Sequence, residues 1–119
     1  SQTYREPVGV IGNILPWNAP CLLFLWHAAM GLACGNTMVA KPAETSPLTA
    51  IYCGKLAAEA GIPEGVLNIV PGFGETAGQA LCRNNKISKI SFTGESITGK
   101  AIMKAASENL IPVSLELGG

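Results

Sequence analysis

Charged residues are scarce in this sequence. Eight Lys or Arg residues balance eight Asp or Glu residues, so the formal net charge is zero, and charged residues make up 13% of the chain. No block of like charges occurs, which argues against a surface built for nucleic acid or an anionic membrane. Apolar residues reach 48%, which is enough for a hydrophobic core and too much for a disordered chain.

Long apolar runs and closely spaced cysteines are also missing. The longest apolar run, Cys21 to Trp26, is far shorter than the ~18 residues of a membrane-spanning helix, so we expect no membrane partner. The cysteines form no Cys-x-x-Cys pair, so we expect no metal site and no redox motif. We predict four buried thiols in a reducing, cytoplasmic location: Cys21, Cys34, Cys53 and Cys82.

Short and long apolar segments alternate along the chain. The short ones predict strands at 8–15, 37–41, 66–70, 87–92 and 113–116, and the long ones predict helices at 22–33, 47–60, 76–83 and 96–107. In the second helix, Leu48, Ile51, Tyr52 and Leu56 share one apolar face. The predicted strands are apolar throughout, which is typical of strands in a parallel sheet that is buried on both faces. We therefore predict an α/β fold. It should be a Rossmann-like open parallel sheet of about five strands with helices on both faces.

A polar or glycine-rich segment follows each predicted strand. In an open parallel sheet, ligands lie beyond the carboxyl ends of the strands. Five such segments on one edge therefore predict a binding site there. The segments are Pro16-Trp17-Asn18, Lys41-Pro42-Ala43-Glu44, Pro71-Gly72-Phe73-Gly74, Thr93-Gly94-Glu95-Ser96 and Glu116-Leu117-Gly118-Gly119.

Two glycine patterns bear on nucleotide binding, and neither is sufficient alone. Gly72 to Gly78 is one residue too long for Gly-x-Gly-x-x-Gly and follows the third strand, so a plain turn into a helix is favoured. Gly94 to Lys100 has the spacing of a phosphate-binding loop. However, Ala101 stands where a hydroxyl would bind magnesium, and Glu95 would repel a phosphate. We therefore disfavour a phosphate-loop nucleotidase.

Lys41 and Glu44 suit a different ligand. A carboxylate accepts hydrogen bonds from vicinal ribose hydroxyls, and a neighbouring lysine donates to ribose or phosphate oxygens. The acid would disfavour a 2′-phosphate, so the pair favours NAD, with NADP a weaker alternative. A surface ion pair at a turn accounts for these two residues equally well.

Taken together and in this order, these motifs resemble the aldehyde dehydrogenase family from Arg5-Glu6-Pro7-Val8-Gly9 to the end of the chain. The resemblance implies that the Asn18 amide stabilises an oxyanion and that Glu116 is a general base. It also implies a small-molecule aldehyde substrate, the cofactor NAD and a homo-oligomeric parent protein. The cofactor-binding positions that it implies are Leu15, Trp17, Lys41, Glu44, Gly74, Gly78, Phe92, Gly94, Glu95 and Gly118.

The implied reaction oxidises an aldehyde to a carboxylic acid. A cysteine adds to the carbonyl, hydride passes to NAD, and water cleaves the resulting thioester. In the resembling family this cysteine lies beyond the Glu-Leu-Gly-Gly motif, and none of the four cysteines here matches its context. We therefore expect residues 1–119 to be part of the nicotinamide-nucleotide-binding domain of a longer enzyme and to be inactive alone. A non-catalytic nucleotide-binding module is the alternative.

Two positions depart from the family pattern. Glu95 stands where many members carry a serine, and this variant resembles some semialdehyde dehydrogenases, which suggests a weak likeness to the betaine-aldehyde and hydroxymuconic-semialdehyde dehydrogenase subgroups. His27 stands where many members carry a lysine. A lone histidine on an apolar helix is more often a core residue, so we assign it no acid–base role.

Overall fold

The computed structural model describes residues 1–118 as alternating strands and helices. The strands are β1 (Val10–Ile14), β2 (Thr37–Lys41), β3 (Leu67–Ile69), β4 (Lys89–Glu95) and β5 (Val113–Gly118). The helices are α1 (Pro20–Ala33), α2 (Leu48–Glu59), the π-helical turn η1 (Gly74–Gly78), α3 (Gln79–Arg83) and α4 (Ser96–Ser107). No helix within this part of the chain is both long and apolar enough to cross a membrane.

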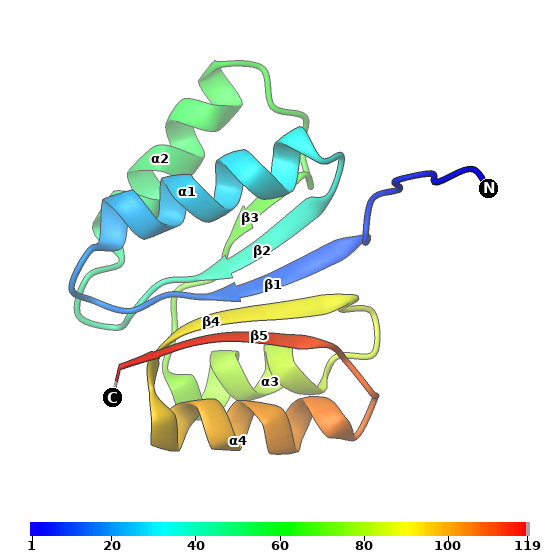
Figure 1. Ribbon diagram of the computed structural model, residues 1–119. Coiled ribbons are helices and arrows are strands. Elements are labelled where there is room, and N and C mark those ends of the chain that lie inside the picture. The colour runs from blue at the N-terminus through cyan, green and yellow to red at the C-terminus, as the bar shows by residue number, and fades with distance from the viewer. Residues whose placement is uncertain (119) are drawn as a thin grey trace.

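The five strands form one parallel sheet in the order β3-β2-β1-β4-β5. Helices α1 and α2 lie on one face of the sheet, and α3 and α4 lie on the other (Figure 1). From β1 the chain continues to β2 and β3 on one side of the sheet, and from β4 it continues to β5 on the other side. The direction in which successive strands are added, the winding, therefore reverses between β1 and β4. The predicted α/β class, the parallel sheet and the helices on both faces are confirmed.

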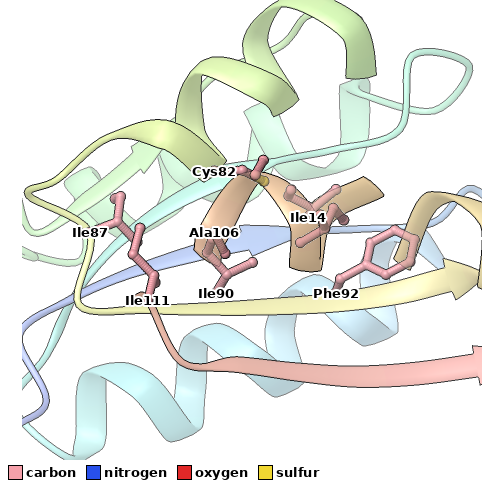
Figure 2. Packing of buried hydrophobic residues seen from close by; sticks show 9 residues of the cluster. Ile14, Cys82, Ile87, Ile90, Phe92, Ala106 and Ile111 are labelled. Atoms are coloured by element: carbon pink, nitrogen blue, oxygen red, sulfur yellow. The ribbon is translucent and has the colours of Figure 1, made fainter. Parts of the chain in front are cut away.

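Each face of the sheet has its own hydrophobic core. On the α3–α4 face, Ile90 is fully buried among Ile14, Phe92, Ile102 and Cys82 (Figure 2). On the α1–α2 face the core contains Leu15, Phe24, Ala28, Met38, Ala40 and Ala50. Burial on both faces explains why the strands read as continuous apolar segments and not as alternating ones.

Helix ends are set by local chain chemistry. Pro20 occupies the first turn of α1, where its missing N–H costs no hydrogen bond. The same helix ends at Ala33, and Gly35 just beyond it has φ +78°. The backbone N–H of Asn36 donates to the Gly31 carbonyl at 3.1 Å, a hydrogen bond typical of a helix that a glycine terminates. After α4, Leu110 takes a comparable left-handed conformation, with φ +53°.

Strand ends differ from the predicted ones where long-range partners decide them. The first strand begins at Val10 and not at residue 8, because the Val8 and Gly9 amides donate to Asn36 Oδ1 at 2.7 and 3.0 Å. At the other end of the sheet, β4 continues to Glu95 because Glu95 pairs with Gly118 of β5. The predicted turn at residues 93–96 is therefore wrong, since Gly94 and Glu95 lie within β4.

Two helical predictions also need correction. The helix predicted at 76–83 is split into η1 and α3. In α2 the apolar side chains Leu48, Ile51, Tyr52 and Leu56 are 43–77% exposed within the described chain, while Ala50 is buried. The helix packs on the sheet through small residues: a Cβ added to Gly54 would lie 2.9 Å from Ile69 Cγ1. Close approach of the backbone therefore decided which face of α2 lies inward.

Candidate functional site

The carboxyl ends of the strands meet in register at one edge of the sheet. Ile14 of β1 pairs with Lys41 of β2 on one side and with Phe92 of β4 on the other. Phe92 pairs in turn with Leu115 of β5. The segments that follow these positions therefore emerge side by side, next to the reversal of winding between β1 and β4, which is where open α/β sheets bind ligands.

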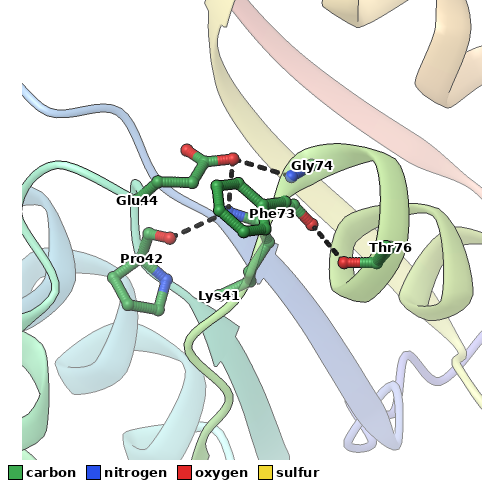
Figure 3. A network of polar contacts seen from close by, with 6 residues as sticks. All are labelled: Lys41, Pro42, Glu44, Phe73, Gly74 and Thr76. Carbon is green, nitrogen blue, oxygen red and sulfur yellow. Dashed lines mark hydrogen bonds and ion pairs between the residues drawn. The ribbon is translucent and has the colours of Figure 1, made fainter.

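Lys41, Glu44 and Gly74 form a polar network at this edge (Figure 3). Glu44 Oε1 accepts a hydrogen bond from the Gly74 amide at 2.7 Å and lies 3.6 Å from Lys41 Nζ. Lys41 Nζ also donates to the Pro42 carbonyl at 2.9 Å. The network joins the segment after β2 to the segment after β3, which are 30 residues apart in sequence.

The network holds a buried cation against a partly exposed carboxylate. Lys41 is 3% exposed, whereas the Glu44 side chain is 41% exposed. A hydrogen bond from its own backbone N–H lowers the pKa of Glu44 most strongly, and the Gly74 amide and Lys41 lower it further against the opposing effect of burial. Glu44 is therefore ionised at neutral pH, and its exposed part is free to accept hydrogen bonds from a ligand.

A groove of about 470 Å³ lies beside this network, between η1 and α3 on one side and α4 on the other. Gly74 and Gly78, both predicted as binding positions, line it together with Ile97 and Ala101 of α4. The sequence prediction missed the two α4 residues and also Gln79. An apolar Ile97 in the first turn of a helix, 79% exposed, was the signal that could have indicated a ligand-facing surface.

A second cavity, of about 920 Å³, lies on the opposite face of the sheet and is lined by His27 and Glu116. Lys89, Ser91 and Ser114 also line it. Burial lowers the pKa of His27, and the nearby Glu116 carboxylate partly opposes that shift. His27 is thus half-buried against the cavity and faces a carboxylate, whereas the sequence predicted a core residue.

Strands β4 and β5 carry apolar and polar side chains on opposite faces. Ile90 and Phe92 belong to the core beneath α3 and α4, and Leu115 packs against that core. Their chain neighbours Ser91 and Glu116 line the 920 Å³ cavity. One face of this strand pair is therefore dry and the other is polar and open within the described chain.

The remaining predicted positions are dispersed around the same edge. Trp17 is 70% exposed and Asn18 is exposed, and both precede α1. Leu15 and Phe92 are 4% and 5% exposed and belong to the cores on opposite faces of the sheet. Their side chains therefore pack inside the protein next to this edge and do not reach its surface. Gly94 allows close packing, since an added Cβ would lie 2.5 Å from Phe92 Cζ.

The last residues of the predicted site continue a strand. Glu116 and Gly118 belong to β5, in register with Thr93 and Glu95 of β4. Gly119, which completes the final motif, lies outside the described residues.

The prediction of four buried thiols is confirmed for Cys82 alone. Cys82 is buried and its pKa is raised by burial to about 11, whereas Cys53 is half-buried and Cys21 and Cys34 are exposed. Cys21 and Cys34 lie at the two ends of α1. Composition indicates how often a cysteine is buried and not where on a helix it falls.

The reversal of winding, the polar carboxyl edge and the adjoining groove are features of the Rossmann-like α/β class, in which ligands bind at this edge of the sheet. The sequence matches the model of the aldehyde dehydrogenase family over residues 1–119, so the chain belongs to that family.

Curated relatives and solved structures agree with this assignment. The chain is 58% identical to the mitochondrial aldehyde dehydrogenase family 2 member B4 of Arabidopsis thaliana, over 98% of its own length and 22% of the relative's. It is 57% identical to human retinaldehyde dehydrogenase 3, over 98% and 23% of the two lengths. The structure resembles PnpE in complex with nicotinamide adenine dinucleotide, with a TM-score of 0.95 and 47% identity over 97% and 24% of the two chains. The chain therefore spans less than a quarter of these relatives.

Proposed function

We propose that residues 1–119 are part of the nicotinamide-nucleotide-binding domain of an NAD-dependent aldehyde dehydrogenase that oxidises an aldehyde to a carboxylic acid. The observation that carries the proposal is the Lys41–Glu44–Gly74 network at the carboxyl edge of the sheet. Support comes from family membership and from PnpE, which was solved in complex with nicotinamide adenine dinucleotide.

The residues present fit an adenosine ribose. Glu44 is ionised, and the Gly74 amide fixes the orientation of its carboxylate, so the carboxylate can accept hydrogen bonds from vicinal hydroxyls. A 2′-phosphate would bring like charge against it, which favours NAD over NADP. Beside it, the 470 Å³ groove with apolar walls at Ile97 and Ala101 suits a flat base.

The other predicted binding positions stay part of the proposal: Leu15, Trp17, Gly74, Gly78, Phe92, Gly94, Glu95 and Gly118. When bound, the nicotinamide would accept a hydride from the substrate. Trp17 and Glu95 offer exposed side chains at this edge. Gly78 lies against the Lys41 stem, since a Cβ added to Gly78 would lie 3.5 Å from Lys41 Cδ.

Two residues would act on the substrate itself. The Asn18 amide, exposed just after β1, would donate a hydrogen bond to the oxygen that becomes negative when the cysteine adds to the aldehyde. Glu116, facing the 920 Å³ cavity, would remove a proton from the water that hydrolyses the thioester. We place the nucleophilic cysteine outside residues 1–119.

Transient kinetics of the protein that carries this chain test both roles. Glu116→Gln should preserve the first burst of NADH and slow thioester hydrolysis by roughly 100-fold or more, as for loss of a general base. Asn18→Ala should slow the burst itself by a similar factor. The conservative exchange Glu64→Gln, at an exposed position outside the site, serves as the control. An unchanged hydrolysis rate in Glu116→Gln would remove that residue from the role of base.

The absence of aldehyde oxidation, together with retained NAD binding, would favour a non-catalytic nucleotide-binding module. We further propose a cytoplasmic location and a homo-oligomeric assembly for the whole protein. Relatives of the chain are named both cytosolic, in Rattus norvegicus, and mitochondrial, in Arabidopsis thaliana. Cell fractionation and light scattering would test these two statements.

A further inference from the structure

Cys21 and Cys53 lie on helices that pack against each other. Cys21 is in the first turn of α1, and Cys53 is in the second turn of α2. The two helices share the core that contains Phe24 and Ala28 of α1 and Ala50 of α2, and Cys53 packs against the same core.

Helical spacing places each thiol on the face of its helix that carries the shared core residues. On α1, Cys21, Phe24 and Ala28 follow one another at three and four residues, so they share one face. On α2, Ala50 and Cys53 are three residues apart and share a face in the same way. Each cysteine therefore continues, by one turn, the row of side chains through which its helix joins the shared core.

Cys21 lies close enough to Cys53 to affect its protonation. Burial raises the pKa of Cys53 most strongly, and the nearby Cys21 raises it further. Cys21 is also exposed, so one member of the pair is accessible to a small reagent from solvent. The other cysteines of the chain are placed differently, since Cys34 lies beyond the opposite end of α1 and Cys82 is buried on the other face of the sheet.

We propose that Cys21 and Cys53 form a dithiol modification site that a small peroxide converts into an intramolecular disulfide between α1 and α2. Cys21 Sγ attacks hydrogen peroxide, the O–O bond breaks, and a sulfenic acid and one water are formed. Cys53 Sγ then attacks that sulfur, the S–O bond breaks, and the Cys53 proton leaves with the hydroxide as a second water. Two thiols and one peroxide thus become one disulfide and two waters.

Position decides what the disulfide would constrain. Cys21 follows Asn18 by three residues, so a bond to α2 would tie the first turn of α1, and the segment that leads into it, to a second helix. The site itself depends only on the α1–α2 packing. Its test is therefore independent of the proposed dehydrogenase function.

The experiment is peptide mapping of the folded, reduced protein that carries this chain, after treatment with hydrogen peroxide and blocking of the remaining thiols. Without reductant, we expect a cross-linked peptide that joins Cys21 to Cys53, two hydrogens lighter than its parts. It should form about tenfold faster than any disulfide of Cys34, because the two thiols are held together.

Matched variants separate a specific pair from random oxidation. Cys34→Ser should leave the Cys21–Cys53 peptide unchanged, whereas Cys53→Ser and the apolar Cys53→Ala should both abolish it while Cys21 still becomes oxidised. Circular dichroism of all variants before oxidation confirms that they are folded. Oxidation of Cys21 to a sulfinic acid while Cys53 stays reduced, or linkage to Cys34 at an equal rate, would overturn the proposal.

Discussion

Replacing Glu44 by glutamine preserves the shape of the side chain and removes its charge. Two contacts depend on that charge: the 2.7 Å hydrogen bond from the Gly74 amide and the 3.6 Å ion pair with Lys41. A hydrogen bond to a charged group contributes about 1 kcal/mol more than a neutral one. Because Glu44 is 41% exposed, solvent screening limits the ion pair to about 1 kcal/mol at most.

The joint effect is therefore about 1–2 kcal/mol, localised at the link between the segments after β2 and β3. Hydrogen exchange at the Gly74 amide reads this link directly, because opening of the loop must break its hydrogen bond to Glu44. In the protein that carries this chain, we expect Glu44→Gln to exchange the Gly74 amide about 5- to 30-fold faster. Glu64→Gln, at an exposed position away from the network, should leave it unchanged.

The same effect should depend on pH in a defined direction. The pKa of Glu44 is lowered from 4.5 in the folded chain, so its contribution is fully present above about 4.5 and is lost as the pH falls through the lowered value. The difference between wild type and Glu44→Gln should thus be constant near neutral pH and shrink in acid. An equal Gly74 exchange rate in the two proteins at pH 7 would refute the reasoning.

Two further predictions concern stability and are read from urea unfolding of the protein that carries this chain. Leu110 is 87% exposed and has φ +53°, a conformation that costs a residue with a side chain roughly 1 kcal/mol. Leu110→Gly should therefore stabilise the protein by about 0.5–1 kcal/mol, whereas Leu110→Ala should not. Equal effects of the two variants would show that the gain does not come from the backbone. Ile90 is fully buried, so Ile90→Ala should lower the free energy of unfolding by about 2–5 kcal/mol. Ile97 is exposed, so Ile97→Ala should lower it by less than ~0.5 kcal/mol. Similar losses at both positions would contradict the assignment of Ile90 to the core.

Local sequence patterns predicted which segments form helices and strands better than they predicted the long-range contacts of those segments. The helix at Ser96–Ser107 lies where its periodicity places it, and the polar segments after the strands meet at one edge of the sheet, as predicted. The extension of β4 to Glu95 could not be predicted in the same way, because it depends on pairing with Gly118, 23 residues later.

The burial of α2 and of the cysteines was mispredicted for a related reason. An apolar stripe such as Leu48, Ile51 and Tyr52 is visible in the sequence, but the contact of Gly54 with Ile69 that brings another face inward is not. Likewise, the proposed pairing of Cys21 with Cys53 depends on the packing of two helices, which the sequence does not show. For the site, the sequence indicated Lys41 and Glu44, whereas the groove walls at Gln79 and Ala101 emerged only from the fold.

The alternation of side chains along β4 and β5 has a consequence for how the protein can vary. Residues such as Ile90 and Leu115 are constrained by volume, whereas Ser91 and Glu116, each beside them in the chain, face the cavity and are constrained by chemistry. A substitution at Ser91 or Glu116 would therefore change the polarity of the cavity, whereas one at Ile90 or Leu115 would change the packing of the core. Insertion of a single residue in β4 would exchange the two sets, so such variation should proceed by substitution and not by changes of length.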